Sequence, residues 1–176
     1  MKTSWYQSFR ALMVVMVALS AVAMAPGFTV AQAVHDPAEH IRGVLLQSAK
    51  AFENGNMAAL EKAWANDESV TVFESGHANY GWADYRDKHL GPEMKEMKNT
   101  KYALSDIQVK VSGNTAWAIF KYSLSADLGS RHVESGGLGT AVLEKRGQDW
   151  KIVHWHSSAP RRPPAPAASP AKNPGR

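Results

Sequence analysis

The residues that follow Asp36-Pro37 place apolar side chains at the spacing of an amphipathic helix. Aspartate is a good N-cap, and proline fits the first turn of a helix. One face of this segment collects the apolar residues Ile41, Val44, Leu45, Ala49 and Phe52. The pattern predicts a helix over residues 37–53 that ends at the turn 54–56, followed by a shorter helix with Trp64 on its inner side.

The next segments mix strand and helix patterns. The β-branched run within residues 69–74 predicts a first strand, because such side chains favour a half-buried pleated surface. A turn at 75–77 then leads into a helical stretch over residues 82–90. We expect Gly91-Pro92 to break this helix, because the residue before a proline disfavours the helical conformation.

After about residue 100 the apolar residues alternate with a period of two. This alternation predicts four more strands, over residues 102–111, 115–126, 131–145 and 150–157. Three glycines inside the third of them, at 136, 137 and 139, indicate a bulge or a sharp bend. Helices followed by an antiparallel sheet indicate an α+β fold, with the N-terminal helices packed in a strongly curved antiparallel sheet.

The first 33 residues have the layout of a secretory signal peptide. A short basic stretch precedes an uncharged apolar run over residues 11–25, and the small-residue triplet Ala31-Gln32-Ala33 follows. The sequence therefore predicts a periplasmic or secreted protein, cleaved after Ala33 or, as second choice, after Ala25. An uncleaved membrane anchor is the alternative. We expect no stable membrane insertion, because the apolar run is shorter than the ~20 residues that span a bilayer.

Charge and composition narrow the function classes. The 176 residues carry a formal charge of +4, but residues 1–33 hold two basic residues without an acid and residues 160–176 hold four. Residues 34–159, the predicted folded domain, are therefore mildly acidic, which gives no support for a nucleic-acid partner. The absence of cysteine excludes disulfides, thiol nucleophiles and cysteine-ligated zinc.

Residues 160–176 are rich in proline, alanine and arginine and contain no large apolar side chain. Such a segment cannot bury enough surface to order itself, so it predicts a disordered tail. The tail is either a plain spacer or a weak electrostatic contact with an anionic envelope surface.

Several motifs resemble a known family. The most specific is the closing segment Trp150-Lys151-Ile152-Val153-His154-Trp155-His156-Ser157-Ser158, which follows Gly139-Thr140-Ala141-Val142-Leu143. Three more are Ala51-Phe52-Glu53-Asn54-Gly55-Asn56, Val72-Phe73-Glu74-Ser75-Gly76 and Tyr85 with His89-Leu90. Together with the order of the elements, they resemble the SnoaL-like branch of the nuclear transport factor 2-like superfamily, with a cystatin-like fold, over the whole predicted domain.

This resemblance implies a cone: a bent sheet around helices, with an apolar cavity open at one end. It also implies a homodimer through the outer face of the sheet. It does not fix an activity, because the same cone hosts isomerases, cyclases, dehydratases and binding modules.

The last predicted strand carries two histidines. Because side chains alternate along a strand, we expect Trp150, Ile152, His154 and His156 to share one face, opposite Lys151, Val153 and Trp155. His154 and His156 could bind one metal ion if His89, or else Glu74 or His77, supplied a third ligand. The alternative is that both histidines are hydrogen-bonded to the backbone, a tyrosine or a carboxylate, and no cofactor is then expected.

A second constellation consists of Glu74, His77, Tyr85 and His89. Glu74 ends a predicted buried strand, and the spacing of Tyr85 and His89 places both on one helical face. A carboxyl group at an apolar cavity wall suits a general acid or base, and a tyrosine or histidine can donate to a developing enolate oxygen. The structural alternative is that Glu74 caps a turn, Tyr85 fills the core and His89 satisfies the helix C-terminus.

Three functions remain open. The first is an exported module that binds a small apolar or amphipathic molecule. Its predicted lining residues are Trp64, His77, Trp82, His89, Trp117, Tyr122 and His154. The second is an enzyme of the isomerase, cyclase or dehydratase type that acts on a carbonyl compound, with Glu74, His156 and Tyr85 as catalytic candidates. The third is the histidine metal site.

Overall fold

The computed structural model describes residues 36–160, so the predicted signal peptide and the tail beyond Pro160 lie outside the described residues. The helical elements are α1 (Pro37–Glu53), α2 (Met57–Ala63), α3 (Trp82–Tyr85), the π-helical turn η1 (Arg86–Leu90) and α4 (Gly91–Glu96). The strands are β1 (Thr71–Glu74), β2 (His77–Tyr80), β3 (Met97–Ser112), β4 (Thr115–Leu128), β5 (Arg131–Arg146) and β6 (Asp149–Ser158). Over residues 36–160, no helix combines the length and apolar character needed to cross a membrane.

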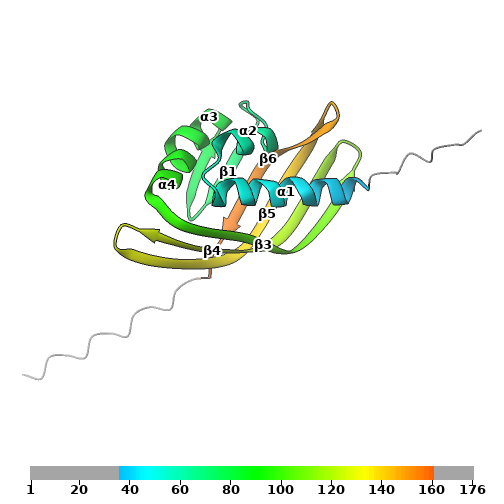
Figure 1. Cartoon of the computed structure of the whole chain (residues 1–176). Coiled ribbons are helices and arrows are strands. Elements are labelled where there is room, and N and C mark those ends of the chain that lie inside the picture. The colour runs from blue at the N-terminus through cyan, green and yellow to red at the C-terminus, as the bar shows by residue number, and fades with distance from the viewer. Residues whose placement is uncertain (1–35, 161–176) are drawn as a thin grey trace, which may run out of the picture. The chain divides into compact units, whose positions relative to one another are not determined.

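The strands form one unclosed sheet in the order β2-β1-β6-β5-β4-β3. Neighbouring strands are antiparallel except β1 and β6, which pair in parallel. Figure 1 shows the long strands β3, β4 and β5 curving around α1, with the shorter helices beside β1. The predicted α+β fold, with helices packed in a strongly curved sheet, is confirmed.

The first helix has the predicted bounds because its local signals agree with its packing. The side chain of Asp36 accepts a hydrogen bond from the backbone N–H of Ala38 at 2.9 Å, and Pro37 occupies the first turn. Ile41 and Leu45 are fully buried against the sheet. Asn56 likewise caps α2 by accepting from the N–H of Ala59 at 3.0 Å, as its side chain predicts.

The helical stretch after β2 does not break at Gly91-Pro92, so this prediction is wrong. The backbone widens into the π-helical turn η1, in which the N–H of Gly91 donates to the carbonyl of Arg86, and α4 continues to Glu96. A Cβ atom at Gly91 would lie 2.8 Å from that carbonyl oxygen, so glycine is needed there. The wider turn lets the chain pass Pro92 and brings one more turn of helix to the inner face.

The glycines of β5 do not form a bulge; they make room for atoms of the neighbouring strands that lie close to β5. β5 pairs with β4 without a register shift across Gly136, Gly137 and Gly139. A Cβ atom at Gly139 would meet the ring of Phe120, and one at Gly137 would meet the backbone of Ser158. Glycine therefore lets the inner aromatic ring and the end of β6 lie directly on β5.

A register shift does occur between β5 and β6. Val142 pairs with His154 and Leu143 with Ile152, so Val153 is an extra residue on β6. This bulge reverses the alternation of side chains beyond it. Trp155 and Ser157 face inward, whereas His154 and His156 face the outer side of the sheet. The expected facing of the last strand therefore fails after residue 153.

Candidate functional site

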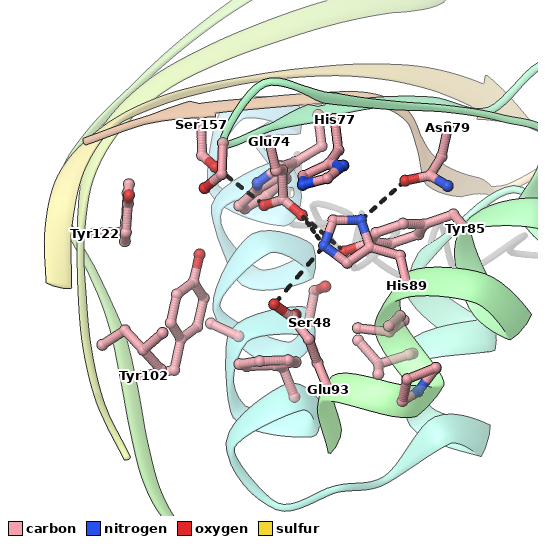
Figure 2. Close-up of a pocket in the computed structure, with 18 of the residues that line it drawn as sticks. Ser48, Glu74, His77, Asn79, Tyr85, His89, Glu93, Tyr102, Tyr122 and Ser157 are labelled. Carbon is pink, nitrogen blue, oxygen red and sulfur yellow. Dashed lines mark hydrogen bonds and ion pairs between the residues drawn. The ribbon is translucent and has the colours of Figure 1, made fainter. Parts of the chain in front are cut away.

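A pocket of about 550 Å³ lies between α1, the segment from η1 to α4, and the inner face of the sheet. Apolar side chains make up much of its wall, namely Ala49, Phe52, Leu60, Trp64, Leu90, Leu124 and Trp155. Polar side chains gather where β1 and β2 face η1 (Figure 2). A pocket of this size and composition is typical of small-molecule sites.

Glu74 stands at the centre of the polar group. It is the last residue of β1, and its side chain points inward because it alternates with the outward-facing Phe73. The hydroxyl of Ser157 on β6 donates to Oε1 of Glu74 at 3.1 Å, and the hydroxyl of Tyr85 on α3 donates to Oε2 at 3.4 Å. The carboxyl group is thus held from two sides (Figure 2).

Burial raises the pKa of Glu74 above its ordinary value. The neighbouring carboxylate of Glu93 raises it further, while His89 and the hydrogen bonds from Ser157 and Tyr85 act in the opposite direction. A carboxyl group with a raised pKa can hold a proton closer to neutral pH and can therefore act as acid or base.

His89 faces the same carboxyl group from η1. Its Nε2 lies 4.0 Å from Oε2 of Glu74 and 3.7 Å from Oε1 of Glu93. Its Nδ1 lies 2.9 Å from Oδ1 of Asn79 on β2. The ion pair with Glu93 raises the pKa of His89, and Glu74 adds to this effect, although burial opposes it. The imidazole and two carboxyl groups therefore form one coupled cluster.

Tyrosines complete the polar part of the wall. Tyr85 is buried, and burial raises the pKa of its hydroxyl well above the ordinary value, so that it stays a proton donor. Tyr102 and Tyr122 lie on the β3 and β4 side of the pocket, with ring centroids 6.1 Å apart (Figure 2). Burial also raises the pKa of Tyr102. Three phenol groups thus line the pocket that holds Glu74.

The structural alternative for this constellation is only partly correct. Tyr85 does fill the core, but Glu74 is bonded to side chains and not to a backbone turn. The helix also continues past His89, so this residue does not satisfy a helix end there. The structure brings Glu74, Tyr85, His89 and His77 together at one pocket, as their spacing predicts.

The aromatic residues predicted to line the cavity divide into three groups. Trp64 and Tyr122 line the pocket. Trp82 is buried but does not line it; its ring packs 5.7 Å from Trp64 in the core behind. Trp117 lies on the outer face of β4 and is 46% exposed, so its predicted place in the cavity is wrong.

The histidines of β6 also lie outside the pocket. His154 pairs through Nδ1 with the hydroxyl of Thr71 at 2.7 Å and packs edge-on against Phe73. Burial lowers its pKa, and His156 adds to this effect. His156 is exposed on the same outer face. The predicted catalytic role of His156 and binding role of His154 therefore do not fit this pocket, because the bulge at Val153 turns both away.

The positions of the histidines also test the hypothesis that three of them bind one metal ion. His89 lies inside the pocket, on the opposite side of the sheet from His154 and His156, so these three residues do not meet. Among residues 36–160, no group of three or more histidine or acidic side chains is arranged to hold a metal ion.

The polar residues of the site that were not predicted from the sequence include Ser157, Asn79, Glu93 and Tyr102. Glu93 lies four residues after His89, a spacing that places both on one helical face. Glu93 was not predicted because the helix was expected to end at Gly91-Pro92. Tyr102 alternates in phase with Leu104 on β3, which signals an inward direction.

A comparison with protein families identifies residues 41–162 as a SnoaL-like domain. The chain belongs to this family. The SnoaL-like match spans almost all of the described residues, including every residue of the pocket. No curated protein matches the chain.

Solved structures share the fold of this SnoaL-like domain. One is a nuclear transport factor 2-like superfamily protein from Salmonella enterica serovar Typhimurium LT2, with 17% identity, a TM-score of 0.67, and coverage of 75% of this chain and 96% of that chain. A candidate dehydratase of the same family from Streptomyces avermitilis has 18% identity, a TM-score of 0.65, and coverage of 72% and 97%. A candidate ketosteroid isomerase from Shewanella frigidimarina has 24% identity, a TM-score of 0.58, and coverage of 66% and 92%. At these identities the likeness establishes the fold alone.

Proposed function

We propose that this SnoaL-like domain binds a small apolar or amphipathic molecule whose polar end, a carbonyl or hydroxyl group, meets Glu74. One observation carries the proposal: the half-buried carboxyl group of Glu74, held by Ser157 and Tyr85, stands in a wall of aromatic and aliphatic side chains. The wall would bury the apolar part of the ligand, and the polar cluster would fix its orientation.

The neutral dye N-phenyl-1-naphthylamine provides a direct test, because its fluorescence rises in an apolar site. We expect saturable binding to the unmodified chain. Ser135 lies at the pocket on β5, so Ser135→Trp should narrow the opening and weaken dye binding at least tenfold. Ser123→Trp is the matched control, because residue 123 faces the outer side of the neighbouring strand. Equal binding by both variants would exclude this pocket as the dye site.

A second candidate function is proton transfer on a carbonyl compound. The observation that favours it is the placement of Nε2 of His89 at 4.0 Å from Glu74, whose raised pKa suits an acid or base. The names of two structural neighbours, a candidate ketosteroid isomerase and a candidate dehydratase, are consistent with such chemistry.

Glu74→Gln separates binding from catalysis. The amide keeps the shape of the side chain but cannot take up a proton. With 3-cyclohexen-1-one as the probe ketone, an enzyme would form the conjugated isomer, and the variant should lose about two to four orders of magnitude in rate. Dye binding should survive the change. If the unmodified chain does not accelerate the isomerisation, the binding function stands alone.

We also propose a homodimer through the outer face of the sheet. Large apolar side chains are exposed on that face, namely Phe73, Tyr80, Trp117, Ile119 and Leu138. Exposed apolar patches of this kind favour association. The double variant Trp117→Lys/Ile119→Lys should be monomeric by sedimentation velocity, whereas Leu46→Lys, an equally exposed leucine on α1, should leave the state unchanged. A monomeric unmodified chain would exclude the dimer.

Export remains part of the proposal. The basic start, the apolar run and the triplet Ala31-Gln32-Ala33 support a cleaved leader. Mass spectrometry of the protein from a periplasmic fraction should give a mature chain that begins at Val34. A chain that keeps residues 1–33 and stays with the cytoplasmic fraction would contradict export.

A further inference from the structure

A run of hydrogen bonds leads from the surface of α3 to the pocket. Oδ2 of Asp84 accepts from the side-chain amide of Asn79 at 2.9 Å and from the backbone N–H of Tyr80 at 3.3 Å. Lys88 pairs with the other carboxylate oxygen at 2.8 Å. Asn79, almost fully buried, then reaches His89. Asp84 itself does not line the pocket.

The charge of Asp84 determines how the amide of Asn79 is oriented. Lys88 and Asn79 lower the pKa of Asp84 to about 2, so this residue is a carboxylate at neutral pH and only accepts hydrogen bonds. Asn79 must therefore turn its NH2 group toward Asp84. Its carbonyl oxygen is left to face His89, and it too can only accept.

The orientation of Asn79 in turn fixes the ring of His89. Because Oδ1 of Asn79 accepts at 2.9 Å, Nδ1 of His89 must carry a proton in both the neutral and the charged ring. When the ring is neutral, Nε2 has no proton and holds a lone pair. Figure 2 shows this nitrogen on the side of the ring away from Asn79, toward Glu74 and Glu93.

The other groups that face His89 allow either state of Nε2. Glu93 on α4 and Glu74 on β1 lie at 3.7 and 4.0 Å from this atom. Tyr85 on α3 and His77 on β2 contact the ring with centroid separations of 5.4 and 6.2 Å. None of these groups contacts Nδ1, and both carboxyl groups lie farther from Nε2 than the hydrogen-bond distance of 2.9 Å that joins Nδ1 to Asn79, so the bond to Asn79 is the one that keeps the proton of the neutral ring.

We infer that Asp84 and Asn79 are positioning residues that hold a proton on Nδ1 of His89 and leave Nε2 as the atom that exchanges a proton with the ligand. The inference deepens the proposed function and rests on it. It also narrows the ligand class. A charged ring donates from Nε2 to a carbonyl oxygen, and a neutral ring accepts there from a hydroxyl group. The pocket is lined by three glutamates, Glu74, Glu93 and Glu96, and by one lysine, Lys88, which is paired with Asp84; this excess of acidic groups disfavours an anionic ligand.

The tautomer can be read directly in the unliganded full-length protein. Long-range 15N–1H correlation spectra at a pH above the titration of His89 distinguish a ring protonated at Nδ1 from one protonated at Nε2. We expect the Nδ1–H form. In Asp84→Asn the new side chain is a neutral amide, which can both donate and accept a hydrogen bond and so no longer dictates the orientation of Asn79. We therefore expect a mixture of the Nδ1–H and Nε2–H tautomers of His89. Asp87→Asn, the same change at an exposed residue bonded to Arg86, should keep the Nδ1–H form.

An Nε2–H ring in the unmodified protein, or an unchanged tautomer in a folded Asp84→Asn, would overturn the inference. The unmodified protein alone decides the first point, so the test does not depend on the stability of the variant. Failure of the proposed function looks different. A pocket that does not bind the neutral dye leaves the tautomer assignment intact, and an Nε2–H ring leaves dye binding intact.

Discussion

The hydroxyl of Ser157 donates to the carboxyl group of Glu74 across 3.1 Å, and the two residues are also register partners in the parallel pair of β6 and β1. Strand pairing thus places the central acid of the pocket and its hydrogen-bond donor together. Side chains on rigid strands are held more precisely than side chains on loops. The position of Glu74 is therefore a property of the sheet.

Ser157→Ala should raise the pKa of Glu74 further, because the lost hydrogen bond favours the ionised carboxylate. Titration of the Glu74 side-chain carbon by 13C NMR measures the change. Ser158→Ala is the control, since that neighbouring residue is exposed and has no bond to Glu74. A pKa that stays constant or falls in Ser157→Ala would contradict the role given to this hydroxyl.

Glu74 and His89 should each make the free energy of unfolding fall as the pH rises through the range in which that residue titrates. Glu74 has a raised pKa in the folded state, so the unfolded chain ionises first, and stability is lost above the ordinary value of 4.5. His89 also has a raised pKa, so its contribution is complete below 6.5 and is lost as the pH rises through the folded value.

Urea denaturation at a series of pH values would resolve these two contributions. Glu74→Gln should flatten the part of the curve that begins near 4.5, and His89→Gln the part that begins near 6.5. A variant whose curve keeps the slope of the unmodified chain in its range would show that the shift of that residue is absent. The lowered pKa of His154 gives a slope of the opposite sign near 6.5, but it is common to all three proteins.

Gly139→Ala should destabilise the fold by about 1–3 kcal/mol, because the new methyl group overlaps the ring of Phe120 in a packed core. Gly43→Ala provides the contrast. Residue 43 lies inside α1 with open space around it, so alanine should stabilise the helix by about 0.5–1 kcal/mol. Thermal unfolding of both variants measures the difference. Equal unfolding midpoints for the two variants would show that the ring of Phe120 moves aside without a loss of stability.

Ser48→Ala should cost about 1–3 kcal/mol, because the indole N–H of the buried Trp64 donates to the Ser48 hydroxyl at 3.1 Å and would lose its partner. Adding Trp64→Phe removes the unsatisfied donor. In a double-mutant cycle the two changes should therefore cost less together than the sum of the single changes. Simple additivity would mean that water replaces the lost hydroxyl.

Local signals predicted α1 well. The cap at Asp36, the proline that follows and the apolar face all agree with burial against the sheet, so the helix has the expected bounds. The prediction of a helix break at Gly91-Pro92 was wrong because a proline breaks an ordinary helical turn, whereas here a π-helical turn precedes it. The backbone that accommodates Pro92 is set by packing over the pocket, which local propensity does not encode.

The sequence of β6 does indicate the direction of its side chains. Trp150 and Ile152 alternate in one phase, and Val153 and Trp155 continue in the other, so the apolar pattern itself changes phase where the bulge occurs. The prediction assumed strict alternation from residue 150 onward, so it placed His154 and His156 on the inner face of the sheet.

Glu74, Tyr85 and His89 could be grouped from the sequence because two of them share a helical face and the third ends a strand beside it. Ser157 and Asn79 could not. Their places depend on the parallel pairing of β1 with β6 and on the edge strand β2, which are long-range features of the sheet.

The parallel pair of β1 and β6 also governs when the pocket comes into being. β6 lies inside the sheet, between β1 and β5, although it comes last in sequence among the strands of residues 36–160. Until it inserts, β1 lacks its inner neighbour and Glu74 remains in water. Contacts that join residues 83 positions apart form slowly, because a long loop must close first. A folding chain would thus assemble the hydrogen bonds around Glu74 only after β6 has joined the sheet.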